Sequence, residues 1–154
     1  MRVKCVVDTN VLISAALSKG APFRVVEHLI KNNALIFSKE TISELSSRIT
    51  QPKFYKYVSA DDREAYVNNL ILSADLVIID NLIQGCRDRD DDKFLETAVK
   101  GDAQFIISGD QDLLTMHRFE GNDIITVPEF SLCTQFKNGH GFTRHSFCFT
   151  ASRP

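Results

Sequence analysis

The stretch RVKCVVDTNVLISAAL, from Arg2 to Leu17, sets the pattern of the chain. Its first half is a mostly apolar run that ends at Asp8, which is typical of a buried β-strand. Its second half carries apolar residues at helical spacing: Val11, Leu12, Ala15 and Ala16. A strand that passes directly into a helix is the repeating unit of α/β folds, so this stretch predicts that fold class.

The same alternation continues along the chain. Further short strands are predicted at 34–37, 75–80 and 103–110 and within 123–130, where Pro128 starts a final turn or helix. Further helices are predicted at 20–32, 38–49 and 59–74 and through 94–99. Ser38 and Ser59 are candidate N-caps. The order predicts an α/β fold, a three-layer α/β/α sandwich around a mainly parallel sheet.

Composition limits the classes of function. The chain has 154 residues, 44% hydrophobic and 25% charged, as expected of one globular domain. Its net charge of −2 excludes a highly basic nucleic-acid binder that acts by bulk electrostatics, although a local basic face stays open. No apolar run approaches the roughly 18 residues of a spanning helix, and no signal peptide is visible. We therefore expect a cytoplasmic protein without a membrane partner.

Cysteine usage and the C-terminal segment add two expectations. The four cysteines are far apart and form no CxxC pair, which favours free thiols in a reducing cytoplasm and no structural zinc. The segment KNGHGFTRHSFCFTASRP (137–154) differs in character from the rest. We expect one domain at 1–136 and a tail at 137–154. The tail can serve as an edge strand or as an oligomer or partner contact.

Two predicted strands end in an aspartate, at Asp8 and at Asp110. Each can simply cap the following helix, and for a single aspartate that is the favoured interpretation. Functional groups of open parallel sheets, however, gather beyond the carboxyl ends of the strands. Two such aspartates in one sheet therefore point to a shared crevice.

The run CRDRDDDKFLETA (Cys86–Ala98) holds four aspartates within five positions. Helical spacing puts Asp91 on the buried stripe of Phe94 and Leu95, one turn earlier. Its neighbours are expected to face solvent or to complement the helix dipole: Asp88, Asp90 and Asp92. Clustered carboxylates oppose one another's ionisation. Oxygen ligands without a cysteine or histidine cluster favour Mg²⁺ or Mn²⁺.

The chain resembles the PIN domain family over roughly Val3 to Phe130. The resemblance rests on three motifs in order: VVDTNVLISAAL (Val6–Leu17), SKETISEL (Ser38–Leu45) and CRDRDDDKFLETAVKGDAQFIISGDQDLL (Cys86–Leu114). It is greatest to PIN-family toxins of bacterial and archaeal toxin–antitoxin systems. The resemblance implies a PIN-like α/β/α domain that uses Mg²⁺ or Mn²⁺ to hydrolyse RNA phosphodiester bonds. It also implies an antitoxin protein as a partner and a homodimer.

The resemblance assigns roles by position. Asp8, Glu44, Asp91 and Asp110 match the four catalytic acids, and Asp8, Asp91 and Asp110 would hold metal. Asp112 would be a further ligand or support the others. Asn10 and Ser108 match the polar residues that orient Asp8 and Asp110. Glu44 follows from the resemblance alone, because it lies off the apolar face of its helix and amphipathicity predicts an exposed surface acid.

For other residues the sequence gives weaker evidence of a role in binding RNA. Scattered lysines and arginines can contact phosphates but are as readily solvated: Lys53, Lys56, Arg87, Arg89, Lys93, Arg118 and Lys137. Tyr55 and Tyr57 can stack on unpaired bases, although packing of a short helix is the favoured use. One rival function is a non-catalytic RNA- or protein-binding module, which would be expected to lack one of the acids. Another is an aspartate-based phosphatase, disfavoured because Asn10 stands where its second aspartate belongs.

Overall fold

The computed structural model describes the backbone of residues 3–140 and the side chains of residues 3–133. Its centre is a six-stranded sheet in the order β3-β2-β1-β4-β6-β5, in which only the pairing of β5 with β6 is antiparallel. The strands are β1 (Cys5–Val7), β2 (Leu35–Ser38), β3 (Ala74–Val77), β4 (Phe105–Ile107), β5 (Arg118–Phe119) and β6 (Asn122–Ile125). The predicted, mainly parallel sheet is confirmed.

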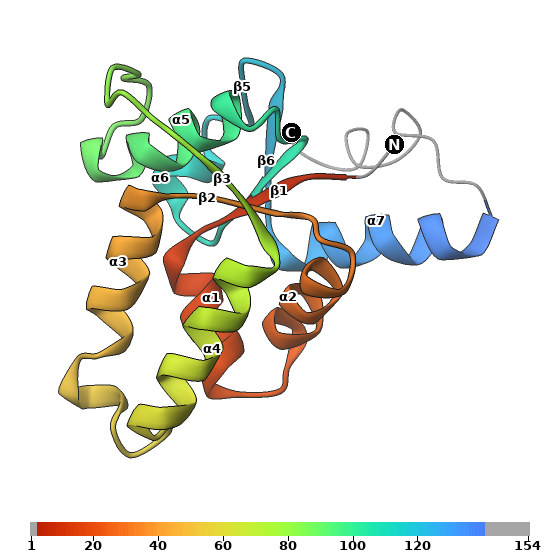
Figure 1. Ribbon diagram of the computed structural model, residues 1–154. Coiled ribbons are helices and arrows are strands. Elements are labelled where there is room, and N and C mark those ends of the chain that lie inside the picture. The colour runs from red at the N-terminus through yellow and green to blue at the C-terminus, as the bar shows by residue number, and fades with distance from the viewer. Residues whose placement is uncertain (1–2, 141–154) are drawn as a thin grey trace.

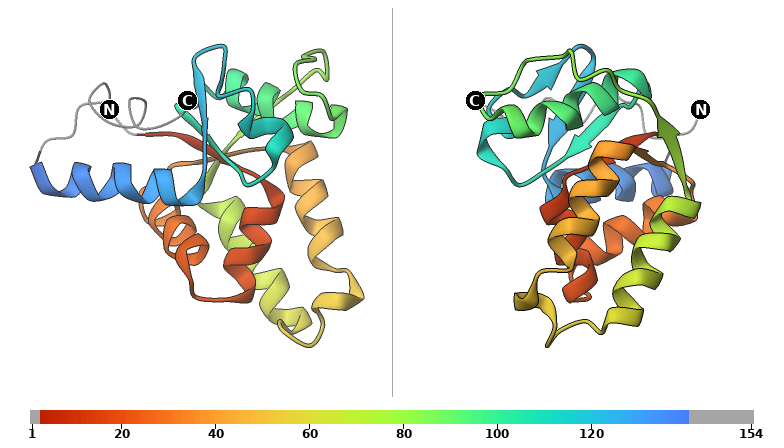
Figure 2. Two further views of the ribbon diagram at one scale, coloured as in Figure 1. Left: turned by 180° about the vertical axis from the view of Figure 1, so that it is seen from behind. Right: turned by 60° about the vertical axis from the view of Figure 1, so that its left-hand side comes forward.

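Within this part of the chain, helices cover both faces of the sheet (Figure 1; Figure 2). One face carries α1 (Thr9–Leu17), α2 (Ala21–Lys31), α3 (Lys39–Ile49), α4 (Ala60–Leu72) and α7 (Val127–His140). The other carries α5 (Asp92–Lys100) and α6 (Gln111–Leu114). Two short 3₁₀ turns, η1 (Pro52–Phe54) and η2 (Arg89–Asp91), lie in the connections. The three-layer prediction is therefore confirmed.

Successive residues of the central strands belong to two hydrophobic cores. In β1, Cys5 and Val7 pack into the core under α1–α4 and α7, whereas Val6 packs into the core under α5. The neighbouring strands follow the same two-residue period, with Leu35, Phe37, Phe105 and Ile107 in the first core and Ile36, Ile106 and Ile124 in the second. Burying one large aliphatic side chain stabilises by roughly 1.5–3 kcal/mol. This burial fixes the register, so the carboxyl ends of β1 and β4 are held at the same edge.

Both predicted N-caps are confirmed. The Ser38 hydroxyl accepts from the Thr41 N–H at 3.3 Å, and the Thr41 hydroxyl accepts from the Ser38 N–H at 2.9 Å. This capping box starts α3 directly where β2 ends. The Ser59 hydroxyl caps α4 by accepting from the Asp62 N–H at 3.1 Å. The cap on α3 brings the second turn of that helix to the carboxyl edge of the sheet.

Two elements are very short, α6 and β5. The sequence interpretation allowed a helix capped by Asp110, which α6 is, whereas β5 was not predicted. β5 forms a hairpin with β6 through Glu120 and Gly121, whose φ angles are 46° and 87°. Positive φ at both central positions is typical of the tight turns that join antiparallel strands. The elements are too short, at four and two residues, to show a periodic sequence pattern.

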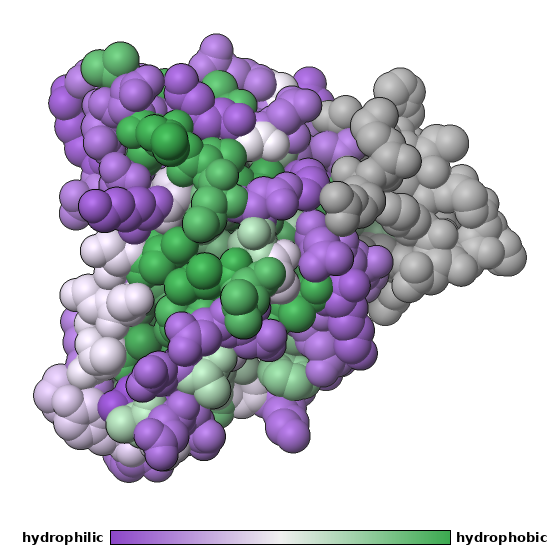
Figure 3. Space-filling model, viewed as in Figure 1, coloured by the Kyte–Doolittle hydropathy of each residue, from purple (hydrophilic) through white to green (hydrophobic). Residues whose placement is uncertain are grey.

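The β3 side of the sheet carries exposed aliphatic side chains: Leu72, Leu76, Ile78 and Leu82. A green band in Figure 3 runs over this part of the surface. Within residues 3–140, every helix is too short or too polar to cross a lipid bilayer.

The cysteine expectation holds in part. Cys5 and Cys86 are free, buried thiols, whereas Cys133 is disulfide-bonded, which contradicts the prediction of free thiols throughout. α7 runs to His140, so the first residues of the predicted 137–154 tail continue this helix. The role predicted for the remainder of the tail concerns residues outside the described range.

Candidate metal centre

Asp8 lies at the carboxyl end of β1, where it caps α1. The Asn10 N–H donates to its Oδ1 at 3.4 Å, and the Ser108 hydroxyl donates to its Oδ2 at 2.8 Å. Burial raises the pKa of Asp8, and the charges of Asp110 and Glu44 act in the same direction, against the effect of the two hydrogen bonds. A buried carboxylate with like charges nearby is a site that favours a bound cation.

Asp110 and Asp112 follow β4, the parallel neighbour of β1. Asp110 caps α6 by accepting from the Asp112 N–H at 2.8 Å, and its own N–H donates to the Ser108 hydroxyl at 2.9 Å. Ser108 therefore contacts both strand-end aspartates. Asp112 forms an ion pair with Arg87, whose Nε lies 3.3 Å from Oδ1.

Asp91 is 8% exposed and ends the η2 turn just before α5. Burial raises its pKa to about 7, with further contributions from the charge of Asp110, a hydrogen bond with Asp110, and the charges of Asp8 and Asp88. Asp91 is therefore buried close to both strand-end aspartates, Asp8 and Asp110.

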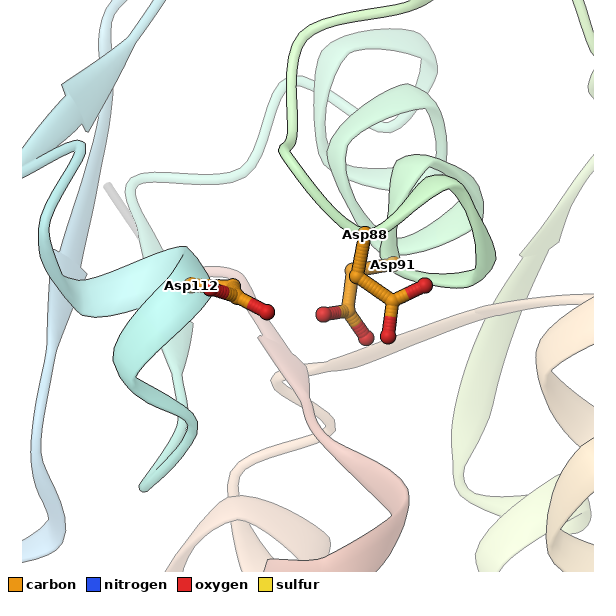
Figure 4. Close-up of side chains that lie close together, drawn as sticks. All are labelled: Asp88, Asp91 and Asp112. Atoms are coloured by element: carbon orange, nitrogen blue, oxygen red, sulfur yellow. The ribbon is translucent and has the colours of Figure 1, made fainter.

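Figure 4 shows Asp88 and Asp91 across a gap from Asp112. One carboxylate oxygen from each of the three lies within 4.8 Å of the other two. Asp88 also caps η2 by accepting from the Asp90 N–H at 3.0 Å. The sequence interpretation treated Asp88 as a cap or surface acid and missed its place beside Asp91. Its position three residues before Asp91 was the available signal.

Glu44 lies in the second turn of α3, and its side chain is 13% exposed. The Thr9 hydroxyl donates to Oε2 at 2.5 Å, and Lys93 lies 2.5 Å and Arg48 3.6 Å from Oε1. The exposed surface acid expected from amphipathicity is therefore wrong, because α1 and α5 supply partners that helical phase in α3 does not show. The charge of Glu44 raises the pKa of Asp8, so Glu44 lies beside the group of aspartates that is called the cluster here: Asp8, Asp88, Asp91, Asp110 and Asp112.

Asn10 contacts Asp8 through its backbone N–H, and its side chain is exposed. The side-chain Oδ1 accepts from Arg48 at 3.2 Å. Asn10 thus connects Asp8 to the arginine that pairs with Glu44.

Asp92 is buried, which corrects the expectation that it faces solvent. Its Oδ1 accepts from the N–H groups of Gly85 and Cys86 at 3.0 and 2.8 Å. The physical reason is that the segment before η2 folds back over the start of α5. Asp90, by contrast, is exposed as expected. Of the three consecutive aspartates, Asp91 alone faces the cluster.

Glu96 is a buried acid that sequence reasoning did not single out. Its carboxylate accepts four consecutive backbone N–H groups, those of residues 80–83. Burial alone would raise the pKa of Glu96, but these donors lower it. Glu96 therefore holds the loop between β3 and η2, which leads to Asp88 and Asp91.

The arrangement suits a hard divalent cation. The donors are carboxylate oxygens, which Mg²⁺ and Mn²⁺ prefer. Among the described side chains, Arg87 alone forms an ion pair with one of the aspartates 8, 88, 91, 110 and 112. Burial first, and then the neighbouring aspartates, raise the pKa of Asp91, so a bound cation would stabilise its charged form.

Comparison with known proteins agrees with the geometry. A family model described as "PIN domain" matches residues 4–112. The uncharacterized protein MJ1680 of Methanocaldococcus jannaschii is 30% identical over 119 residues, which cover 75% of this chain and 76% of that protein. The crystal structure of PAE2754 from Pyrobaculum aerophilum matches with a TM-score of 0.58 over 88% of this chain and 90% of that one. It is 15% identical, so it shows a shared fold alone.

Proposed function

The chain belongs to the PIN domain family, whose members are in general metal-dependent nucleases, and from this premise we propose that it is a divalent-metal-dependent endoribonuclease. One observation carries the proposal. Five aspartates gather at the carboxyl edge of the sheet, and one of them, Asp91, has its pKa raised to about 7.

Mg²⁺ or Mn²⁺ is the proposed cofactor. Asp8, Asp91, Asp110 and Asp112 form the predicted ligand set, and the position of Asp88 supports adding it. A bound divalent ion would supply a Lewis acid that activates water and offsets the charge that develops on a phosphate.

The remaining residues position the acids. Ser108 holds the Asp8 carboxylate and the backbone of Asp110 together. Thr9 and Lys93 fix Glu44 at the border of the cluster, where it can orient water or the substrate. In the hydrolysis, water forms a bond to phosphorus and the ribose oxygen leaves with a proton, so no side chain needs to bond covalently to RNA.

The experiment is cleavage of single-stranded RNA with Mg²⁺ or Mn²⁺, and again with EDTA. We expect turnover with metal, none with EDTA, and a loss of at least two orders of magnitude in Asp8→Asn and Asp91→Asn. Asp90→Asn is the matched control, because Asp90 is the exposed neighbour of Asp91. Wild-type turnover by Asp8→Asn would sink the assignment. RNA binding without any turnover would instead favour the non-catalytic module.

We further propose the toxin role, with an antitoxin partner and a homodimer. Support comes from the resemblance of the three motifs to PIN-family toxins. Induced expression of the wild-type protein should arrest cell growth. Expression of the Asp91→Asn protein to the same level should allow normal growth. Growth arrest by Asp91→Asn protein would contradict a nuclease toxin. Sedimentation of the purified chain would test the homodimer.

A further inference from the structure

The connection between α3 and α4, residues 50–59 and called here the tip, carries exposed aromatic rings. Tyr55 is 56% and Tyr57 is 62% exposed, and no other Tyr or Phe among the described side chains (residues 3–133) is exposed. The tip lies at the end of the helical layer away from the sheet (Figure 1; Figure 2). The favoured sequence interpretation, in which these tyrosines pack a short helix, is therefore wrong.

Each aromatic ring at the tip has a cation beside it. Lys53 Nζ lies 5.1 Å from the centre of the Phe54 ring, and Lys56 Nζ lies 5.1 Å from that of Tyr57. Arg63 Cζ lies 4.7 Å from the centre of the Tyr55 ring. Proteins have about one such contact per 70–80 residues, so this density marks the tip as unusual. Aromatic rings with adjacent cations form the platforms on which unpaired bases stack.

Beside the tip, α3 and α4 enclose a hollow of about 460 Å³, called here the α3–α4 hollow. Its lining includes apolar Ile49, Val67 and Ile71 and polar Thr50, Arg63 and Asn68. Arg63 thus lines the hollow and contacts the Tyr55 ring, while its NH1 donates to the Val58 carbonyl at 2.8 Å. A nucleobase has apolar faces and polar edges, which match this lining.

The α3–α4 hollow and a groove beside the candidate metal centre are both lined by residues of α3. A groove of about 520 Å³ beside Glu44 is lined by Lys39, Ser43, Ser47 and Lys93, among others. Ser43, Ser47 and Thr50 are exposed at i, i+4 and i+7, so they follow one face of α3 from this groove to the hollow. The distance from Glu44 to Thr50 is about 9 Å along the helix axis, a span of a few nucleotides. Hydroxyl groups along such a path are common partners of phosphates.

We propose that the α3–α4 hollow, together with the Tyr55 ring that its Arg63 contacts, binds an unpaired base of single-stranded RNA a few nucleotides from the scissile bond. The proposal rests on the proposed function for its choice of RNA as ligand. Charge contributes little at long range, because Lys53, Lys56 and Arg63 are balanced by Asp61, Asp62 and Glu64. Stacking is therefore the main source of affinity, and the salt dependence of binding at the hollow is shallow.

Intrinsic tyrosine fluorescence reports on this site directly. The chain has three tyrosines and no tryptophan. The third, Tyr66, is half-buried, with its hydroxyl donating to the Leu12 carbonyl at 2.7 Å. A base that stacks on Tyr55 quenches its emission, whereas Tyr66 gives a constant background.

The test titrates full-length protein in EDTA with oligouridylates of increasing length and with a duplex of matched length. We expect saturable quenching by the single strands and none by the duplex. The variants that lack the reporting ring are compared with wild type by the fluorescence anisotropy of a dye-labelled oligouridylate. Tyr55→Ala should weaken the single-strand Kd on the order of tenfold, and Tyr55→Phe should bind like wild type because it keeps an aromatic ring. Tyr57→Ala is the matched control, since Tyr57 is similarly exposed but its neighbouring cation, Lys56, does not line the hollow, and its Kd should change less than twofold.

The outcomes separate the two proposals. Quenching that depends on Tyr55, without metal-dependent cleavage, would overturn the proposed function and keep the RNA subsite. Metal-dependent cleavage together with a wild-type Kd in Tyr55→Ala would overturn the subsite alone. Quenching by neither single strand nor duplex would also overturn it and leave the tip as a protein contact. Unchanged thermal unfolding of Tyr55→Ala would show that a weaker Kd comes from the lost ring and not from a lost fold.

Discussion

The Ser108 hydroxyl donates a hydrogen bond of 2.8 Å to Asp8, although 100 residues separate the two in the chain. The same oxygen accepts from the Asp110 N–H at 2.9 Å. One small side chain therefore connects the ends of two neighbouring parallel strands. The candidate metal centre depends on this connection for the position of its first and last acids.

Ser108→Ala should destabilise the metal-free protein. The buried Asp8 carboxylate would keep its charge but lose its side-chain donor, which costs about 1–3 kcal/mol. Urea denaturation in EDTA measures the free energy of unfolding. Thr115→Ala is the control, because it removes an exposed hydroxyl at the C-cap of α6 whose single hydrogen bond, to the Asp112 carbonyl, is long at 3.4 Å. It should change the free energy of unfolding by less than about 0.5 kcal/mol. Equal midpoints for Ser108→Ala and wild type would show that this hydrogen bond contributes nothing.

The stability of the metal-free protein should fall as pH rises. The pKa of Asp91 is about 7 in the folded state against 3.8 ordinarily, so the folded state holds this proton more tightly than the unfolded state. The contribution of Asp91 is therefore most favourable below about pH 4 and is lost by about pH 7, on the order of 2–4 kcal/mol. Asp91→Asn should flatten the difference in unfolding free energy between about pH 5 and pH 8. A wild-type protein that gains stability over this range would contradict the cluster.

Metal binding should release a proton at mildly acidic pH. Below its pKa of about 7, Asp91 is mostly protonated and must lose that proton to become a ligand. Titration calorimetry with Mn²⁺ near pH 6, in two buffers of different ionisation enthalpy, counts the protons released. We expect close to one for wild type and fewer for Asp91→Asn. No difference between the buffers would exclude Asp91 as a protonated ligand.

Glu96→Gln should loosen the loop that carries Asp88. The amide puts N–H donors against backbone N–H groups that the carboxylate now accepts, so we expect a loss on the order of 3 kcal/mol. Hydrogen exchange should show faster amides at residues 80–83. Glu64→Gln on the exposed surface of α4 should leave those amides unchanged. Unaltered protection in Glu96→Gln would mean that packing alone holds the loop.

The sequence predicted the sheet and its helical layers because hydrophobic periodicity determines them. It also favoured Asp91 among three consecutive aspartates, and Asp91 does face the cluster. Helical spacing requires a continuous helix from Asp91 onward, whereas the chain makes a 3₁₀ turn through Asp91 before α5 begins at Asp92. That difference explains why helical phase misplaced Asp92, which the preceding loop covers.

Contacts between elements that are distant in the sequence could not be predicted from local sequence patterns. The burial of Glu44 comes from Thr9 on α1 and Lys93 on α5, and the spacing of residues within α3 carries no sign of either. Asp88 joins the cluster from a loop that has no periodicity. The exposure of Tyr55 and Tyr57 could not be predicted either, because a short aromatic run has the same sequence pattern whether its side chains are packed or face solvent.

The position of β1 between β2 and β4 has a consequence for synthesis on the ribosome. β1 is synthesised first, and its neighbour β4 follows about a hundred residues later. Synthesis of those residues takes several seconds at about 5–20 residues per second. Until β4 pairs with β1, Asp8 has neither Ser108 nor Asp110 beside it. A nascent chain of the proposed ribonuclease therefore stays inert at least until β4 has been synthesised.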